Sequence, residues 1–158
     1  MSPTNDALPA SPSVVVGTDG GKHSDPALRF AAYEAHLRGV QLVVGIAHLR
    51  PVDPDIDSFD TPEAELNLIS RDKAHRALLR ALDVPPERLP PHRIVTGSGD
   101  PTALLLAIEG AALIVVGLRH RHPLDRFVHG PTRAAALTRH TTVPVVVVPS
   151  AIGQQWST

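Results

Sequence analysis

Short, mostly apolar segments recur along this chain and restrict its possible folds more than any other feature. Their apolar residues are consecutive rather than alternating, and valine dominates them: Ser13–Gly17, Val40–Ala47, His92–Thr96, Leu113–Gly117 and Val143–Val148. Strands with this pattern have both faces covered, which is typical of parallel sheets that lie between two layers of helices. The sequence therefore predicts an α/β protein rather than an all-β or all-helical one.

The stretches between these strands contain signals for the start of a helix. Ser24, Thr61 and Asp100 are capping residues that stand next to a proline or an acidic residue, as in the first turn of many helices. Gly39 suits the end of the first helix, and a short fourth helix is expected over Thr132–His140. We expect the second helix to bury a stripe formed by Leu66, Ile69, Ala74, Ala77, Leu78 and Ala81. This alternation predicts a doubly wound parallel sheet of five strands with right-handed crossovers.

The composition excludes several classes of protein. The 158 residues suit one domain, which we place at residues 13–150 between flexible tails at 1–12 and 151–158. A net charge of -1 gives no bulk attraction to nucleic acid or anionic lipid, and 3% aromatic residues offer few rings for stacking bases. The apolar segments are too short to span a bilayer, and the N-terminus lacks the features of a signal peptide. We therefore expect a cytoplasmic protein without nucleic-acid or membrane partners.

The segment from residue 112 to 149 has the layout of an anion or nucleotide site. The fourth strand ends at Gly117, a basic loop follows, and Gly130 precedes the last helix. Backbone N–H groups at a helix N-terminus bind anions, and ligands of doubly wound sheets lie at the carboxyl ends of the strands, where the winding reverses.

Three pieces of the chain together resemble the universal stress protein (UspA-type) family. They are VVVGTDGGKHSDPALRFA at Val14–Ala31, the turn from Gly97 to Pro101, and VVG-x12-G-P-T…TTVPVVVVP at the end of the chain. The resemblance runs from about Val14 to Val148. It implies a Rossmann-like sheet of the adenine-nucleotide alpha hydrolase kind, which we expect to have the strand order 3-2-1-4-5. We expect its centre to comprise Val14–Val16, Leu42–Val44, Ile94, Val95, Ile114–Val116 and Val145–Val147.

The resemblance also assigns candidate residues to an adenine-nucleotide site. It implies that Thr18 and Asp19 face the adenosine, that Ala47 lies beside the base, and that Val116 and Gly117 line the ribose side. Asp19 has an alternative role as the residue that caps the turn over Gly20–Ser24.

The phosphate side of this motif departs from the family. ATP-binding members carry G-x-x-G-x9-G-[ST] here, and this chain has Gly117 and Gly130 but places His120 and Pro131 at the other two positions, followed by Thr132. A histidine adds a Cβ where phosphate approaches the backbone, and a proline has no N–H to donate. Losses of this kind weaken affinity by roughly one to four decades.

The sequence thus leaves two readings open. In the first, the chain is a stress-response regulatory protein whose adenine-nucleotide site is degenerate. Such a site binds nucleotide weakly or has lost nucleotide binding altogether. In the second, it is a true ATP or AMP binder, with magnesium, that senses its ligand and changes its partners. Arginines would then hold the phosphates in place of the missing groups: Arg119, Arg121, Arg126 and Arg133.

Other motifs are incomplete. Gly20–Lys22 lacks the remaining positions of a P-loop, and the acidic loop Asp53–Asp57 lacks the glycine and the final glutamate of a calcium loop. The histidines His120, His122 and His129 have no carboxylate at helical spacing, so we expect no metal site. Without a cysteine or a G-x-S-x-G serine, no catalytic residue is indicated, and a slow ATPase is the only enzymatic option.

The last strand, 143–148, is expected to lie at an edge of the sheet. An exposed valine-rich edge invites pairing with another chain, and related proteins pair this strand across a two-fold axis. We therefore expect a homodimer formed through this strand.

Overall fold

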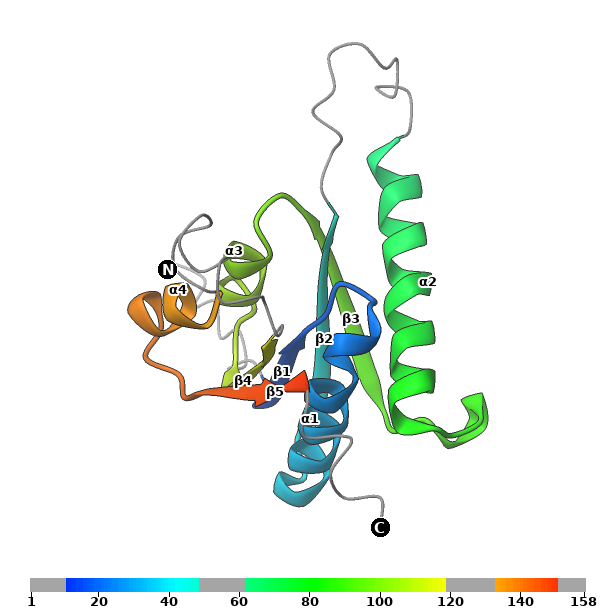
Figure 1. Cartoon of the computed structure of the whole chain (residues 1–158), viewed down its shortest axis with the longest axis horizontal. Helices are drawn as coiled ribbons and strands as arrows, with labels where there is room; N and C mark the ends of the chain where they lie inside the picture. Colours follow the sequence, from blue (N-terminus) through cyan, green and yellow to red (C-terminus); the bar gives the residue numbers. More distant parts are fainter. Residues whose placement is uncertain (1–10, 49–61, 119–132, 151–158) are drawn as a thin grey trace, which may run out of the picture.

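A computed structural model describes residues 11–48, 62–118 and 133–150 of the chain. All five strands of its sheet are parallel, in the order β3-β2-β1-β4-β5, as predicted (Figure 1). The strands are β1 (Ser13–Gly17), β2 (Gln41–His48), β3 (His92–Ser98), β4 (Ala111–Leu118) and β5 (Val145–Pro149). The helices are η1 (Lys22–Ser24), α1 (Asp25–Arg38), α2 (Glu63–Leu82), η3 (Pro86–Arg88), α3 (Pro101–Leu106) and α4 (Arg133–His140).

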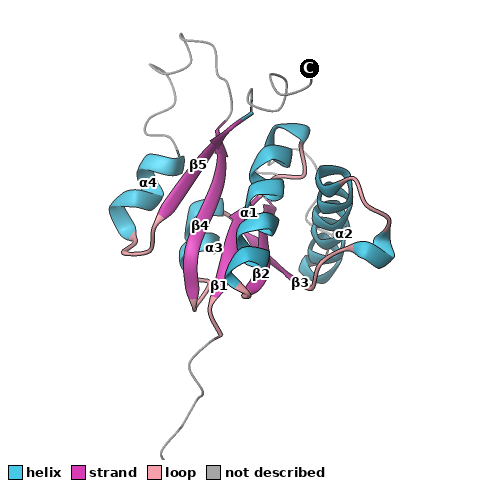
Figure 2. Ribbon diagram, turned by 90° about the horizontal axis from the view of Figure 1, so that it is seen from below, coloured by secondary structure: helices cyan, strands magenta, loops and turns pink. Residues whose placement is uncertain are grey.

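Helices cover both faces of the sheet, because successive residues of a strand point to opposite sides. Val14 and Val16 pack with residues of α1 and α2, whereas Val15 packs with Leu105 of α3 and Leu137 of α4. Figure 2 shows α1 and α2 together on one side of the sheet. The two apolar layers make one doubly wound domain.

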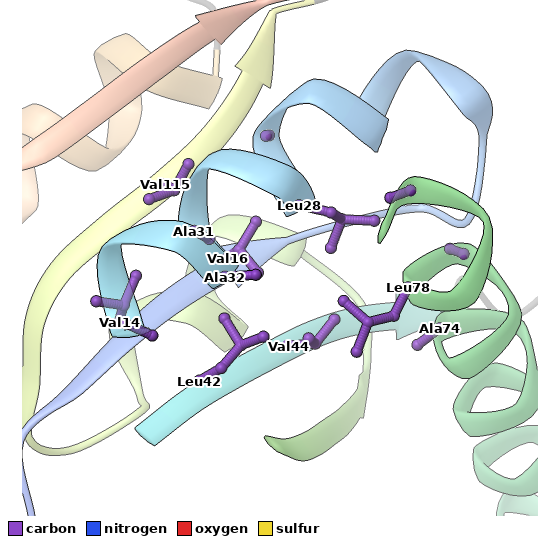
Figure 3. Packing of buried hydrophobic residues seen from close by; sticks show 14 of the residues in the cluster. Val14, Val16, Leu28, Ala31, Ala32, Leu42, Val44, Ala74, Leu78 and Val115 are labelled. Atoms are coloured by element: carbon purple, nitrogen blue, oxygen red, sulfur yellow. The ribbon is translucent and has the colours of Figure 1, made fainter. Parts of the chain in front are cut away.

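Small side chains bring α1 close to the sheet. Ala27 and Ala31 are fully buried, and Leu28 beside them fills the space between α1, β1 and α2 (Figure 3). Gly39 ends the helix in the left-handed conformation, with φ of 63°, and its N–H bonds to the carbonyl oxygen of His36 at 3.1 Å. The predicted glycine cap is confirmed.

One residue of the predicted stripe on α2 was placed wrongly. Ile69 is 56% exposed, whereas the neighbouring Ser70 is buried in line with Ala74, Ala77 and Leu78. Successive helix residues are about 100° apart, so Ile69 points away from the side of α2 that holds Ser70 and Ala74. The buried stripe follows the position of the sheet rather than the hydrophobicity of each residue.

The last strand is also less buried than predicted. Val145 and Val146 are only half-buried and Val147 is 38% exposed, although all three were expected at the centre. Val95 on the opposite edge strand, β3, is likewise half-buried. Edge strands have a neighbour on one side only, so a run of valines does not by itself place a strand in the middle of a sheet.

The predictions about the terminal tails fall mostly on residues 1–10 and 151–158, which lie outside the described part of the chain. Among the described helices, none combines the length and the apolar character needed to cross a membrane.

Candidate functional site

A hollow lies at the carboxyl ends of β1, β2 and β4, between α3 and α4. Its open volume is about 50 Å³. The strands β2 and β4 lie on either side of β1, so this is the point where the winding of the sheet reverses, the usual ligand position in such folds. The strands contribute these lining residues: Gly17, Gly45, Ala47, Val116 and Gly117.

The loop after β1 forms one wall and is held by its own side chains. Thr18 Oγ1 lies 2.6 Å from Ser24 Oγ and accepts the N–H of Gly20 at 2.9 Å. Ser24 Oγ also donates to the carbonyl oxygen of Gly21 at 2.8 Å. Ser24 was predicted to cap α1, but its hydroxyl makes no capping bond, because it is committed to this loop instead.

Asp19 holds the turn after β1 and also lines the hollow. Its Oδ1 accepts the N–H of Gly21 at 2.8 Å, which confirms the turn role, and its Oδ2 lies 3.1 Å from His23 Nε2. The side chain is 35% exposed. His23 also lines the hollow and was not selected from the sequence. Its spacing of four residues from Asp19 is the signal that could have found it.

An arginine of α2 anchors this loop from the far side. Arg80 binds both carboxylate oxygens of Asp25, with Nη2 at 2.8 Å from Oδ1, and it donates to the carbonyl oxygen of Gly20 at 3.0 Å. The hydrogen bond to Asp25 raises the pKa of Arg80, with partial burial opposing it and the charges of Asp25 and Asp19 adding to it. Arg80, fixed by its bidentate pair with Asp25, therefore holds the loop through Gly20, in addition to the hydrogen bonds within the loop.

Gly20 is required where it stands. Its φ is +86°, a conformation that side chains disfavour, and a Cβ there would lie 2.6 Å from Cγ and Cε of Lys73. The stem of Lys73 therefore packs directly on the backbone of the loop.

The opposite wall comes from α3. Asp100 caps this helix, accepting the N–H of Thr102 at 3.0 Å, as predicted. Leu104 and Leu105 line the hollow and lie against glycines of the strands beneath them. Neither leucine was selected as a site residue from the sequence, because no local signal shows which distant residues they meet.

Some of the residues that the sequence suggested for the site lie in the described part of the chain, and their positions can be checked. Thr18, Asp19, Ala47, Val116 and Gly117 all line the one hollow, together with Arg133 at the start of α4. The other candidates lie outside the described residues: Arg119, His120, Arg121, Arg126, Gly130, Pro131 and Thr132.

A doubly wound parallel sheet with a hollow at its switch point defines a class of α/β proteins that bind ligands at the strand ends. The sequence model of the universal stress protein family matches residues 12–149, so the chain belongs to that family. No curated protein sequence matches it at a significant level.

Solved structures support the same fold. The chain is similar to a universal stress protein in complex with cAMP, with 21% identity, a TM-score of 0.58, and coverage of 89% of this chain and 98% of that one. It is similar to an Archaeoglobus fulgidus universal stress protein in complex with dAMP, at 20% identity and a TM-score of 0.57, covering 87% and 97%. A Burkholderia pseudomallei family member gives 21% identity and 0.55, covering 87% and 96%.

Proposed function

We propose that this universal stress protein is a regulatory protein that senses an adenine nucleotide with a single phosphate and holds polyphosphates poorly. The observation that carries the proposal is the hollow at the switch point, which gathers Thr18, Asp19, Ala47, Val116 and Gly117. The similar structures that contain cAMP and dAMP support a nucleoside monophosphate as the ligand.

The lining of the hollow suits the two halves of such a ligand. The partly exposed carboxylate of Asp19 accepts hydrogen bonds from the hydroxyl groups of a sugar. The floor between Ala47, Val116 and Leu105 is apolar, as a planar base requires. Arg133 contributes a guanidinium for one phosphate.

The sequence argues against a firm grip on a triphosphate. His120 and Pro131 replace the residues with which ATP-binding relatives approach the phosphates. The loss of a close backbone approach and of one N–H donor weakens ATP binding by roughly one to four decades. A monophosphate depends less on these groups and loses less.

Calorimetric titration of the wild type with AMP, cAMP and magnesium ATP tests the proposal. We expect AMP or cAMP to bind more tightly than ATP. The double variant His120→Gly, Pro131→Ser should gain at least about tenfold in affinity for ATP with little change for AMP. Tighter binding of ATP than of AMP by the wild type would instead assign the phosphates to the arginine-rich loop.

A second function is favoured by the size of the hollow. Its open volume of about 50 Å³ is far below the roughly 300–1,000 Å³ of ordinary ligand sites. In that case the chain acts through protein contacts alone and the site is a relic. Mass spectrometry of small molecules released from the purified, denatured protein separates the two functions, because a relic site releases no nucleotide.

We also propose that the protein forms a homodimer through β5. This strand pairs only with β4 among the described strands, and Val147 on it is 38% exposed. Val147→Lys should convert the dimer to a monomer in light scattering at tens of micromolar, because a charge does not pack at an apolar edge. Leu68→Lys is the matched control, since Leu68 is 67% exposed on α2. A wild type that is monomeric in the same measurement contradicts the dimer.

A further inference from the structure

Leu105 of α3 lies on a pair of glycines in neighbouring strands. Gly17 of β1 and Gly45 of β2 are partners in the strand register. A Cβ on Gly17 would lie 2.9 Å from Leu105 Cδ1, and a Cβ on Gly45 would lie 2.7 Å from Leu105 Cδ2. These distances are too short for real contacts, so Leu105 occupies space that only two adjacent glycines leave open.

The same leucine faces the hollow. Leu105 is 4% exposed and lines the hollow together with Leu104, whereas the next residue, Leu106, packs in the same core without lining it. Leu105 therefore lies between the floor of the sheet and the space left for a ligand. Because the described hollow is only about 50 Å³, the length of this side chain limits what fits beside it.

We propose that Leu105 is the specificity-determining residue of the site, and that its length sets the size of the ring system that the hollow admits. This inference deepens the proposed binding of an adenine nucleotide and rests on it. Shortening Leu105 opens an apolar space next to the base, which a larger ring fills. A difference of one methylene group in an apolar pocket changes relative affinities by about 10- to 200-fold.

The glycine pair makes a second, opposite variant available. In Gly45→Ala the new Cβ meets the free end of Leu105, so we expect this side chain to be displaced from the sheet. That movement carries Leu105 toward the hollow and reduces the room for a ring. We expect at least about a tenfold loss of affinity for AMP from this added methyl group. In the Leu105→Ala background the same change should have almost no effect, because the two positions are coupled through contact.

The experiment compares AMP with 1,N6-ethenoadenosine monophosphate, whose base carries an additional fused ring. In Leu105→Ala the ratio of the two affinities should shift toward the larger ring by at least about tenfold. Leu106→Ala is the matched control, with the same substitution one residue along α3, and should leave the ratio within about threefold. Leu105→Val provides a milder variant if Leu105→Ala does not fold.

The outcomes separate this inference from the proposed function. Equal ratios in the Leu105 and Leu106 variants, or a Gly45→Ala effect that persists without Leu105, overturn the inference while AMP binding by the wild type still stands. If the wild type binds no AMP, the proposed function fails. The inference about Leu105 is then tested with indole, a ring system without sugar or phosphate. Indole that shifts the amide resonances of Ala47 and Val116 in Leu105→Ala but not in Leu106→Ala supports the inference. No difference between the two variants overturns it.

Discussion

The side of the sheet covered by α1 and α2 and the side covered by α3 and α4 achieve close packing by different means. On the first side the helix supplies the small residues, such as Ala27 and Ala31, and the strands supply valines. On the second side the strands supply the small residues, Gly17 and Gly45, and the helix supplies leucine. The second arrangement borders the hollow. A ligand in the hollow would therefore meet a leucine of the helix as well as the glycines beneath it.

The largest expected effect tests whether side chains on the α1–α2 side contribute more to the free energy of unfolding than those beside the hollow. Leu78→Ala removes a fully buried side chain between α2 and the sheet and should lower the free energy of unfolding by about 2–5 kcal/mol. Leu104→Ala, on a partly exposed residue beside the hollow, should cost clearly less. Urea unfolding followed by circular dichroism measures both. Equal costs for the two variants would remove the distinction between the sides.

The next effect concerns the hollow itself. Asp19→Asn should weaken AMP binding by about 10- to 100-fold, because a charge-assisted hydrogen bond contributes about 1.5–3 kcal/mol. The amide can keep the bond from Gly21 N–H, so stability should change little. Asp25→Asn is the matched control, because Asp25 binds Arg80 and does not line the hollow. It should reduce stability more than affinity, and the reverse pattern would argue against a ligand role for Asp19.

The smallest effect concerns the α1–α2 side alone, where Arg80 of α2 binds Asp25 of α1 and the carbonyl oxygen of Gly20. Arg80→Met should lower the free energy of unfolding by about 1 kcal/mol, since the pair is partly exposed and solvent screens it. Arg76→Met lies one turn earlier on α2, in a pair that is 74% and 56% exposed, and should cost close to nothing. Thermal unfolding of both variants shows whether the bonds from Arg80 to Asp25 and Gly20 stabilise the folded protein. Identical curves would mean that the loop is held by its own side chains alone.

The fold was predictable because its signals are local. Continuous valine runs, alternation with helices and the cap at Asp100 gave the elements, and the family resemblance gave their order. The errors arose where the environment, not the residue type, decides. Ile69 is more apolar than Ser70, yet only the serine faces the sheet. The edge position of β5 was predicted correctly, but Val147 was expected to be buried at the centre of the sheet and is exposed.

The site was predictable in part for the same reason. Thr18, Asp19 and Ala47 stand at strand ends, which local pattern and resemblance both locate, and they do meet in one hollow. The hydroxyl of Ser24 was misjudged because the competing partner, Thr18, is reached only once the loop has folded back. Leu105 was not recognised as part of the site because its contacts, Gly17 and Gly45, are far away in the sequence.

The glycines beneath α3 have a consequence for the energetics of the unfolded chain. Glycine inside a strand loses more backbone entropy on folding than alanine, by roughly 0.5–1 kcal/mol, and Gly45 and Gly97 both lie inside strands. Replacing such residues with alanine is an ordinary route to a more heat-resistant protein. Here the gain is opposed, because a Cβ at Gly45 would lie 2.7 Å from the end of Leu105 and one at Gly97 would lie 2.9 Å from the end of Leu104, so each leucine would have to move. Mutations that restrict the unfolded chain must therefore be sought away from this part of the sheet.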